Sequence, residues 1–336
     1  MTPNRLQQIL DRAARRRFLV IGDLMLDQFV WGKVGRISPE APVPVVEVDR
    51  ESFHAGGAAN VARNLCEFSK RVAVIGMIGT DDGGQRLQDL LAKRKIDISN
   101  CIIQSGYCTT VKTRIIAQHQ QVVRVDREKI SSLDPKVIKK TARTVREKLH
   151  TIDAIIFEDY GKGFLSSDLV EQISRDANRA NKIVMADPNP RHLIEWSEIT
   201  AATPNRSEAF LAAGVPWRGP AESPKKDGDL ARVGNALLKK WSLKYLLITL
   251  GEDGMMLFQR DRKPHHIPTK ARQVYDVSGA GDTAIALFTL ALAGEATPVE
   301  AAEIANHGSA VVVGKLGTAT VTRDELIASL RDDLSM

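Results

Sequence analysis

The chain has 336 residues, of which 43% are hydrophobic and 26% are charged. This composition is typical of a soluble, folded α/β protein and excludes a disordered or collagen-like chain. Lys and Arg number 47 against 41 Asp and Glu, a net charge of +6 that is scattered along the sequence. We therefore expect no nucleic-acid partner, because such a partner needs a concentrated basic surface.

The cysteines and the N-terminal segment indicate the cellular compartment of the protein. The three cysteines have neither CxxC nor Cys/His spacing, which argues for a reducing compartment and against structural zinc. The first apolar run, residues 18–21, is stopped by Gly22 and Asp23, which makes it too short for a signal peptide or a membrane span. We expect a cytoplasmic protein with no membrane partner.

A helix is predicted over residues 3–16, with Arg15, Arg16 and Arg17 at its C-terminal end, and a short apolar strand follows. Further apolar runs alternate with amphipathic segments of helical length. This βαβ alternation predicts an α/β fold with a doubly wound, mostly parallel sheet and helices on both faces. Its ligands should lie beyond the carboxyl ends of the strands. The predicted strands are 18–21, 72–75, 154–157, 183–186 and 246–249, and the helices include 82–93, 135–149 and 230–241.

Two segments, residues 28–53 and 107–126, have strand character, and neither of them contains a helical pattern. We expect them to meet as a small β-sheet that covers the active site as a lid. The alternative is two edge strands appended to the main sheet. With a lid so defined, residues 1–27, 54–106 and 127–336 form the α/β core that binds nucleotide and substrate.

Residues 276–283, with the sequence DVSGAGDT, precede an apolar segment that is predicted to be helical. The amides of Gly279, Ala280 and Gly281 would point outward at the start of that helix, whose dipole favours negative charge. Asp282 lies beside this anion pocket and could take a proton from an alcohol. The alternative is a glycine turn with an Asp cap on a buried helix.

Residues 55–60, with the sequence AGGAAN, open a helix that is predicted to reach about Phe68. Gly56 and Gly57 permit a ligand to approach the backbone, and Asn60 offers a donor and an acceptor to sugar hydroxyls. Near the end of the first strand, Asp23 and Asp27 could accept hydrogen bonds from a polyol. Either acid could instead be a cap or a surface residue.

Asn205 and Glu208 lie three residues apart and so share one helix face. They could hold Mg²⁺-bound water near a triphosphate, since Mg²⁺ prefers oxygen ligands. A capping box explains the same pair equally well. Thr249, Gly251 and Gly254 follow a predicted strand and could turn the chain beneath a nucleotide, although a plain β-turn has the same signature.

Two missing motifs narrow the class of protein. The sequence has no GxxxxGK[ST] loop, which argues against a P-loop NTPase. It also has no GxGxxG after the first strand, which weakens a nicotinamide or flavin role. Phosphoryl transfer by a protein with another nucleotide-binding architecture remains open as a function. In such an enzyme, positioning and charge stabilisation supply most of the rate enhancement.

Taken together, residues 55–60 and 276–283 resemble the two signatures of the ribokinase-type carbohydrate kinases, the PfkB family. The resemblance implies a β lid, ATP with Mg²⁺, and Asp282 as the base beside an anion hole of Gly279, Ala280 and Gly281. It implies sugar contacts from Asp27, Gly56, Gly57 and Asn60, metal and phosphate contacts from Asn205 and Glu208, and ATP along Thr249 and Gly251. We expect Gly254 and Asn306 on the ATP side and Asp23 on the sugar side.

Within this family the chain resembles the heptose 7-phosphate kinases, which phosphorylate the anomeric hydroxyl on the way to ADP-heptose for lipopolysaccharide cores. Those kinases tend to have Asp-Pro-Lys-Gly where this chain has Asp187, Pro188 and Asn189. Lys162, or else Arg36 or Arg191, would then supply the positive charge for the 7-phosphate. The matching stretches are residues 20–27, 36–46, 56–62, 159–163 and 312–318.

The same resemblance, which extends from about residue 18 to 330, carries three further expectations. We expect no adenylyl transfer, because the cytidylyltransferase-like domain of many such proteins does not follow here. A potassium ion could bind near residues 315–319, and a homodimer could form through the lid strands. Two alternatives remain open: a kinase of this fold for fructose, ribose, a nucleoside or another sugar phosphate, and a non-catalytic regulator that binds sugar or nucleotide.

Overall fold

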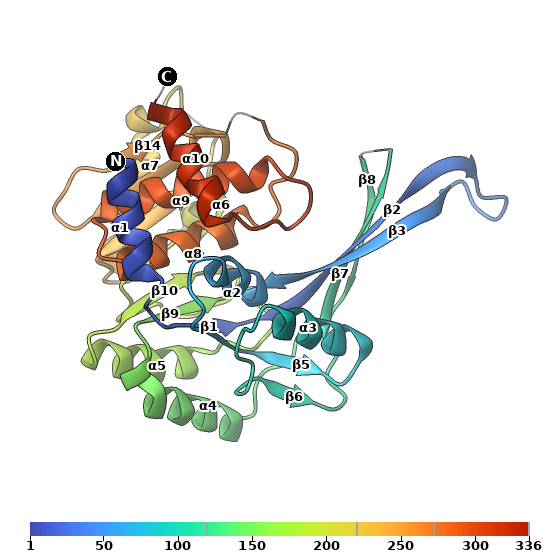
Figure 1. Cartoon of the computed structure of the whole chain (residues 1–336), viewed down its shortest axis with the longest axis horizontal. Coiled ribbons are helices and arrows are strands. Elements are labelled where there is room, and N and C mark those ends of the chain that lie inside the picture. The colour runs from blue at the N-terminus through green and yellow to red at the C-terminus, as the bar shows by residue number, and fades with distance from the viewer. Residues whose placement is uncertain (119, 220, 272, 335–336) are drawn as a thin grey trace.

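In the computed structural model, which describes residues 1–118, 120–219, 221–271 and 273–334, an eight-stranded sheet forms the core (Figure 1). Its strand order is β14-β13-β12-β11-β10-β9-β1-β4, and the strands from β12 to β4 run parallel. The strands are β1 (Phe18–Gly22), β4 (Val72–Ile75), β9 (Ala154–Glu158), β10 (Ile183–Asp187), β11 (Ala201–Ala202), β12 (Tyr245–Thr249), β13 (Met255–Gln259) and β14 (His265–Ile267).

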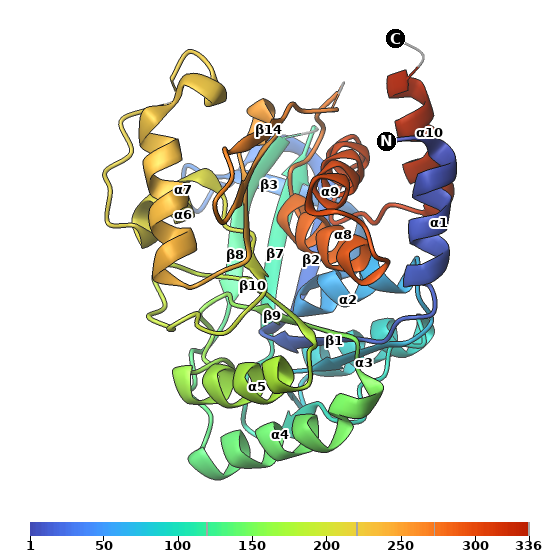
Figure 2. The same cartoon turned by 90° about the vertical axis from the view of Figure 1, so that its left-hand side faces the viewer.

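Helices cover both faces of this sheet (Figure 2). Along β1, Phe18 and Val20 pack into one apolar core, whereas Leu19 and Ile21 pack into the other. This alternation is what a strand buried on both faces requires, and it confirms the doubly wound prediction. The helices are α1 (Pro3–Ala13), α2 (Ala58–Cys66), α3 (Asp82–Lys93), α4 (Pro135–Lys148), α5 (Ser167–Arg179), α6 (Arg206–Ala212), α7 (Gly228–Lys240), α8 (Ala280–Ala293), α9 (Pro298–Val313) and α10 (Arg323–Leu334).

The chain changes direction across the sheet next to β1. It leaves β1 for β4 on one side and returns through β9 on the other, so β1 lies between these two strands. At their carboxyl ends Gly22 pairs with Glu158. In open α/β sheets such a switch point is where ligands bind. Within the described ranges, no helix is both long and apolar enough to cross a membrane.

Both segments that break the βαβ alternation join one smaller sheet, with the strand order β3-β2-β7-β8. This second sheet projects from the core (Figure 1). β2 starts and β3 ends inside the core, where Leu24, Leu26 and Ala55 are buried. β2 therefore begins before residue 28, and β3 ends after residue 53. That the sheet closes as a lid over a ligand stays a prediction. The strands are β2 (Leu24–Ile37), β3 (Pro44–Gly57), β7 (Thr110–Ala117) and β8 (Gln120–Arg127); β5 (Met77–Gly79) and β6 (Ile102–Gln104) pair separately.

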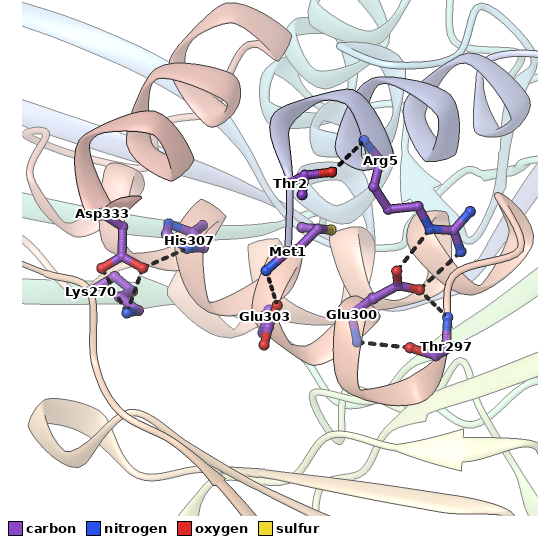
Figure 3. Close-up of polar contacts among 9 residues, drawn as sticks. All are labelled: Met1, Thr2, Arg5, Lys270, Thr297, Glu300, Glu303, His307 and Asp333. Carbon is purple, nitrogen blue, oxygen red and sulfur yellow. Dashed lines mark hydrogen bonds and ion pairs between the residues drawn. The ribbon is translucent and has the colours of Figure 1, made fainter. Parts of the chain in front are cut away.

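Ion pairs fasten both ends of the chain to α9, the helix that packs on α8 (Figure 3). Arg5 of α1 binds Glu300 through two contacts of 2.8 and 3.0 Å, and Glu300 also completes the capping box of α9 with Thr297. The hydrogen bond from Arg5 lowers the pKa of Glu300 to about 2. At the other end, Asp333 of α10 binds Lys270 at 2.7 Å and lies 3.8 Å from Nε2 of His307 on α9. These contacts brace the helix on which α8 rests.

Candidate active site

A cavity of about 470 Å³ lies beyond the carboxyl ends of β9, β10 and β12, at the N-terminus of α8. It lies at the edge of the sheet where the topology predicts a ligand. The sequence-predicted residues that line this cavity are Asn205, Glu208, Thr249, Gly279, Gly281 and Asp282.

The two signature segments meet at Asp282, in the first turn of α8. Its carboxylate is 4% exposed and accepts hydrogen bonds from Asn60 Nδ2 at 2.6 Å and from the Tyr160 hydroxyl at 3.0 Å. Burial raises the pKa of Asp282, while the Asn60 and Tyr160 hydrogen bonds oppose that rise. The result is a buried carboxylate that is held by two donors at the edge of a polar cavity.

Gly279 shows why glycine is needed where α8 begins. Its φ is +80°, and a Cβ there would come within 2.8 Å of Asn60 Nδ2. A side chain would therefore push Asn60 away from Asp282. The amide of Ala280 already donates to the Val277 carbonyl at 3.2 Å, so the helix turn uses that group. An anion hole formed by the amides of Gly279, Ala280 and Gly281 stays a prediction.

Glu158 and Asp187, at the ends of β9 and β10, are acids of the cavity that the sequence did not single out as site residues. Burial, reinforced by Asp187 and Asp282, raises the pKa of Glu158 well above its usual range. Burial and the Glu208 carboxylate act likewise on the pKa of Asp187. The only local sign of these two site residues in the sequence was that each is an acidic residue at the end of an apolar strand.

Asn205 and Glu208 form the capping box that was the structural alternative for this pair. Asn205 Oδ1 accepts from the Glu208 amide at 3.0 Å, and Glu208 Oε2 accepts from the Asn205 amide at 2.8 Å. The pair also lines the cavity beside Thr249, whose backbone bridges to Asn205. Throughout the described residues, no group of three or more His, Cys, Asp or Glu side chains is arranged to ligate a metal. A role for the pair in holding Mg²⁺ through water stays a prediction.

On the side of the second sheet, Asp27 is buried and forms an ion pair with Arg114 of β7 at 2.5 Å. Gly56 lies against the same carboxylate, because a Cβ there would approach Asp27 Oδ2 to 2.5 Å. Gly57, at φ +56°, is the residue from which α2 starts toward Asn60. Of these residues, Asn60 contacts Asp282 directly, and the charge of Asp27 acts on it. Their contact with a sugar stays a prediction.

Asp23 binds the loop that follows β9. Its carboxylate accepts hydrogen bonds from the amides of Tyr160 and Lys162, both at 2.9 Å, and of Phe164 at 3.2 Å. Burial raises the pKa of Asp23 and these amides oppose the rise. The observed role is therefore structural, because this acid fixes the loop that carries Tyr160. A sugar contact by Asp23 stays a prediction.

The three cations that were candidates for a substrate phosphate lie in different places. Lys162 pairs with Glu128 at 2.6 Å, and Arg191 lines the cavity beside Asn189. Arg36 is exposed near the outer end of β2, away from the cavity (Figure 1). A fourth cation, Lys112, which no sequence motif indicated, lies 4.7 Å from the Tyr160 ring centroid.

Gly254 and Asn306, both expected on the ATP side, have structural partners. A Cβ at Gly254 would lie 2.2 Å from the Ile267 carbonyl, so the turn into β13 requires glycine. Asn306 donates to the Pro268 carbonyl at 2.7 Å. Gly251, at φ +64°, lies in the same turn as Gly254. Contacts between ATP and these residues stay predictions.

The loop that was expected to help hold potassium lies against the start of the 276–283 motif. The Gly317 amide donates to Asp276 Oδ2 at 3.1 Å, and the Ser278 amide donates to Asp276 Oδ1 at 2.9 Å. Asp276 therefore joins residues 315–319 to the segment that precedes α8. Potassium binding at this junction stays a prediction.

Ribokinase and phosphofructokinase-2 are among the solved structures with a similar fold. Arabidopsis thaliana ribokinase complexed with ribose and ATP superposes with a TM-score of 0.67 at 17% identity, covering 94% of this chain and 99% of that one. Escherichia coli phosphofructokinase-2 in complex with potassium gives 0.74 at 16% identity, over 96% of this chain and 99% of the other. The fold is thus ribokinase-like.

The family follows from the sequence comparison. The pfkB family carbohydrate kinase pattern matches residues 15–325, and the chain belongs to this family of sugar-phosphorylating enzymes. The bifunctional protein HldE of Desulfatibacillum aliphaticivorans is 39% identical over 316 residues, which is 94% of this chain. The chain spans only 63% of the length of that relative.

Proposed function

We propose that this protein is a kinase that transfers the γ-phosphoryl group of ATP to the anomeric hydroxyl of D-glycero-D-manno-heptose 7-phosphate. The observation that carries the proposal is the buried Asp282 carboxylate, which faces the cavity at the start of α8 and is held by Asn60 and Tyr160. The likeness to HldE over 94% of the chain and the motif at residues 36–46 support the heptose acceptor.

In this mechanism Asp282 accepts the proton of the sugar hydroxyl as its oxygen attacks the γ-phosphorus. One P–O bond forms, the bond to the β–γ bridging oxygen breaks, and ADP leaves with that electron pair. The start of α8 then faces the charge that builds up on the phosphoryl oxygens. Asn60 is suited to orient the sugar, since its buried Oδ1 has no hydrogen-bond partner among the described residues.

Magnesium fits the acidic side of the cavity. Glu158 Oε2 is buried without a hydrogen-bond partner in the described part of the chain, and burial together with neighbouring carboxylates raises the pKa of both Glu158 and Asp187. A bound divalent cation would relieve this repulsion and supply neutralising charge for the phosphates. Asn205 and Glu208 would hold the ion through water.

Lys162 is the proposed ligand of the 7-phosphate. It belongs to the same loop as Tyr160, and its ammonium group has one carboxylate partner, Glu128. Lys112 and Arg114, both on β7, add positive charge to this side of the site. A phosphate that binds here would exchange the Glu128 contact for a charge-assisted contact of its own.

The test is ATP turnover with heptose 7-phosphate, fructose, fructose 6-phosphate, ribose and a nucleoside, with the phosphorylated position identified by ³¹P NMR. We expect heptose 7-phosphate to have the highest kcat/KM and to be phosphorylated at the anomeric oxygen. Lys162→Met should raise KM for this substrate about tenfold, the effect of roughly one charged contact. The exposed Lys263 provides the control variant, Lys263→Met.

Three other outcomes of these assays would contradict the proposal or one of its parts. A preference for an unphosphorylated sugar would overturn the heptose 7-phosphate proposal and leave a kinase with another acceptor. A failure to release ADP with every acceptor would favour the non-catalytic regulator. An unchanged KM in Lys162→Met would remove Lys162 from the phosphate site.

A further inference from the structure

We propose that Tyr160 is a positioning residue for the reaction, because its hydroxyl donates to Asp282 Oδ1 at 3.0 Å and keeps that carboxylate ionised and aimed at the acceptor. This inference rests on the proposed role of Asp282 as the base. It does not depend on which sugar the enzyme uses.

The backbone around Tyr160 is fixed on both sides, which gives its hydroxyl a defined position. Its own amide and that of Lys162 donate to Asp23, and the Gly161 amide donates to Asp159 at 2.9 Å. A side chain at Gly163, where φ is +98°, would meet the Ser131 carbonyl at 2.5 Å. The turn therefore leaves the loop little freedom, and Tyr160 reaches Asp282 from a rigid support.

The ring of Tyr160 has a second partner, the cation of Lys112. Its ammonium nitrogen lies 4.7 Å from the ring centroid, at the distance of a cation–π contact. Lys112 belongs to β7 of the second sheet, where it pairs in register with Asp27. A cation on the ring makes the phenol a better hydrogen-bond donor. The contact also joins the second sheet to the residue that holds the base.

The two donors leave room for a substrate on Asp282. Each carboxylate oxygen offers two lone-pair directions, and the side chains use one on each oxygen: Tyr160 on Oδ1 and Asn60 on Oδ2. The remaining directions can accept the proton of a sugar hydroxyl. Both donors favour the ionised form, and they therefore oppose the effect of burial on the pKa of Asp282.

Other charged and titratable groups also act on Asp282, and they set the background for any pH test. They come from α2, the second sheet, and the ends of β9 and β10. These groups are Arg63, Asp27, Lys112, Glu158 and Asp187, besides Tyr160 itself. Because a change at position 160 alone leaves these groups in place, a shift in the pH profile reports the lost hydroxyl.

The experiment is the pH profile of kcat for Tyr160→Phe, with Tyr107→Phe as a matched control. Tyr107 is a buried tyrosine, and it is not among the residues that line the cavity. Loss of a hydrogen bond to a charged group should move the acidic limb of the Tyr160→Phe profile upward by about one pH unit or more. The KM for ATP should stay within about twofold, because Tyr160 acts on the base. The control should keep the wild-type profile.

A second replacement keeps the shape of the side chain and guards against a folding defect. Replacing Tyr160 by 3-fluorotyrosine makes the phenol more acidic and a stronger donor, so the acidic limb should move downward. Opposite shifts in the two variants support the inference. Unchanged profiles in both overturn it, as does a Tyr160→Phe variant that alters only the KM for ATP.

Asp282→Asn, assayed in parallel, separates this inference from the proposed function. If Asp282→Asn is inactive and the Tyr160 variants keep the wild-type profile, only the positioning role fails. If Asp282→Asn keeps near-normal turnover, the base assignment fails and the positioning role fails with it. The assays use whichever acceptor the wild type phosphorylates, so a wrong sugar assignment does not affect the outcome.

Discussion

Asp282 is the proposed base, and its ionised carboxylate destabilises the folded state because it is buried. Its carboxylate is buried, and burial raises its pKa above the value of an unfolded chain. Between those two values the folded state binds more protons than the unfolded state does. The stability that this group contributes is therefore greatest at low pH and declines as the pH rises through the folded pKa.

Asp282→Asn should separate activity from stability. The amide cannot accept the substrate proton, so kcat should fall by about 10²–10⁴-fold. The free energy of unfolding should be equal to or above that of the wild type at pH 8, because the variant no longer ionises a buried group. Urea unfolding at pH 5 and pH 8, together with kcat, measures both effects, and the exposed Asp261→Asn is the control. Near-normal turnover would exclude Asp282 as the base.

Among the secondary-structure elements, a local cap accounts for one agreement with prediction at both ends of a helix. Residues 82–93 match α3, because Asp81 caps the helix through the Gly84 amide. α1 ends at Ala13 and not at residue 16, so the arginine cluster lies beyond the helix. There Arg16 pairs with Asp153 and Glu295, two contacts with distant residues that the local pattern does not indicate.

The start of α8 is the element on which the site depends most. Gly279→Ala should destabilise the fold by about 2 kcal/mol. The alanine would have to adopt a left-handed φ, and its Cβ would lie too close to Asn60. The variant should also lose kcat, since Asn60 holds Asp282. Gly228→Ala at the first position of α7 is the control: its Cβ meets nothing within 4 Å. Urea unfolding and kcat are the measurements, and wild-type values for Gly279→Ala would contradict this role.

At the scale of the whole molecule, the second sheet has an exposed edge at β8, in which every described residue is exposed. Val123 and Val125 share one face of this strand and are 45% and 52% exposed. Exposed apolar strands at a sheet edge favour pairing with another chain. These features support the expected homodimer through the lid.

Val125→Lys should therefore convert a dimer into monomers. A buried lysine at a strand interface leaves an unpaired charge, so dissociation should be at least about tenfold more favourable. Analytical ultracentrifugation across a range of concentrations measures the change. Ile103→Lys is the control, because Ile103 is 53% exposed on β6, outside the second sheet. A wild-type protein that stays monomeric at high concentration would contradict the dimer.

Three features could be predicted from the amino-acid sequence alone. They are the alternating strands and helices, the two β segments that interrupt them, and the acid at the start of a helix that follows a glycine. Hydrophobic period, caps and the need for positive φ are local properties, so they can be recognised in short stretches of sequence. The family resemblance added which of these short stretches belong to one site.

Which side chains meet depends on how distant segments pack in the folded protein. Asn60 and Asp282 are 222 residues apart, and Tyr160 contacts the same carboxylate from a third segment. The same is true of the pairing of Asp27 with Arg114, and of the hydrogen bond from the Tyr160 amide to Asp23. Such contacts depend on strand order and on the angle at which each loop leaves the sheet. No local pattern encodes them, because they arise only when distant segments pack together.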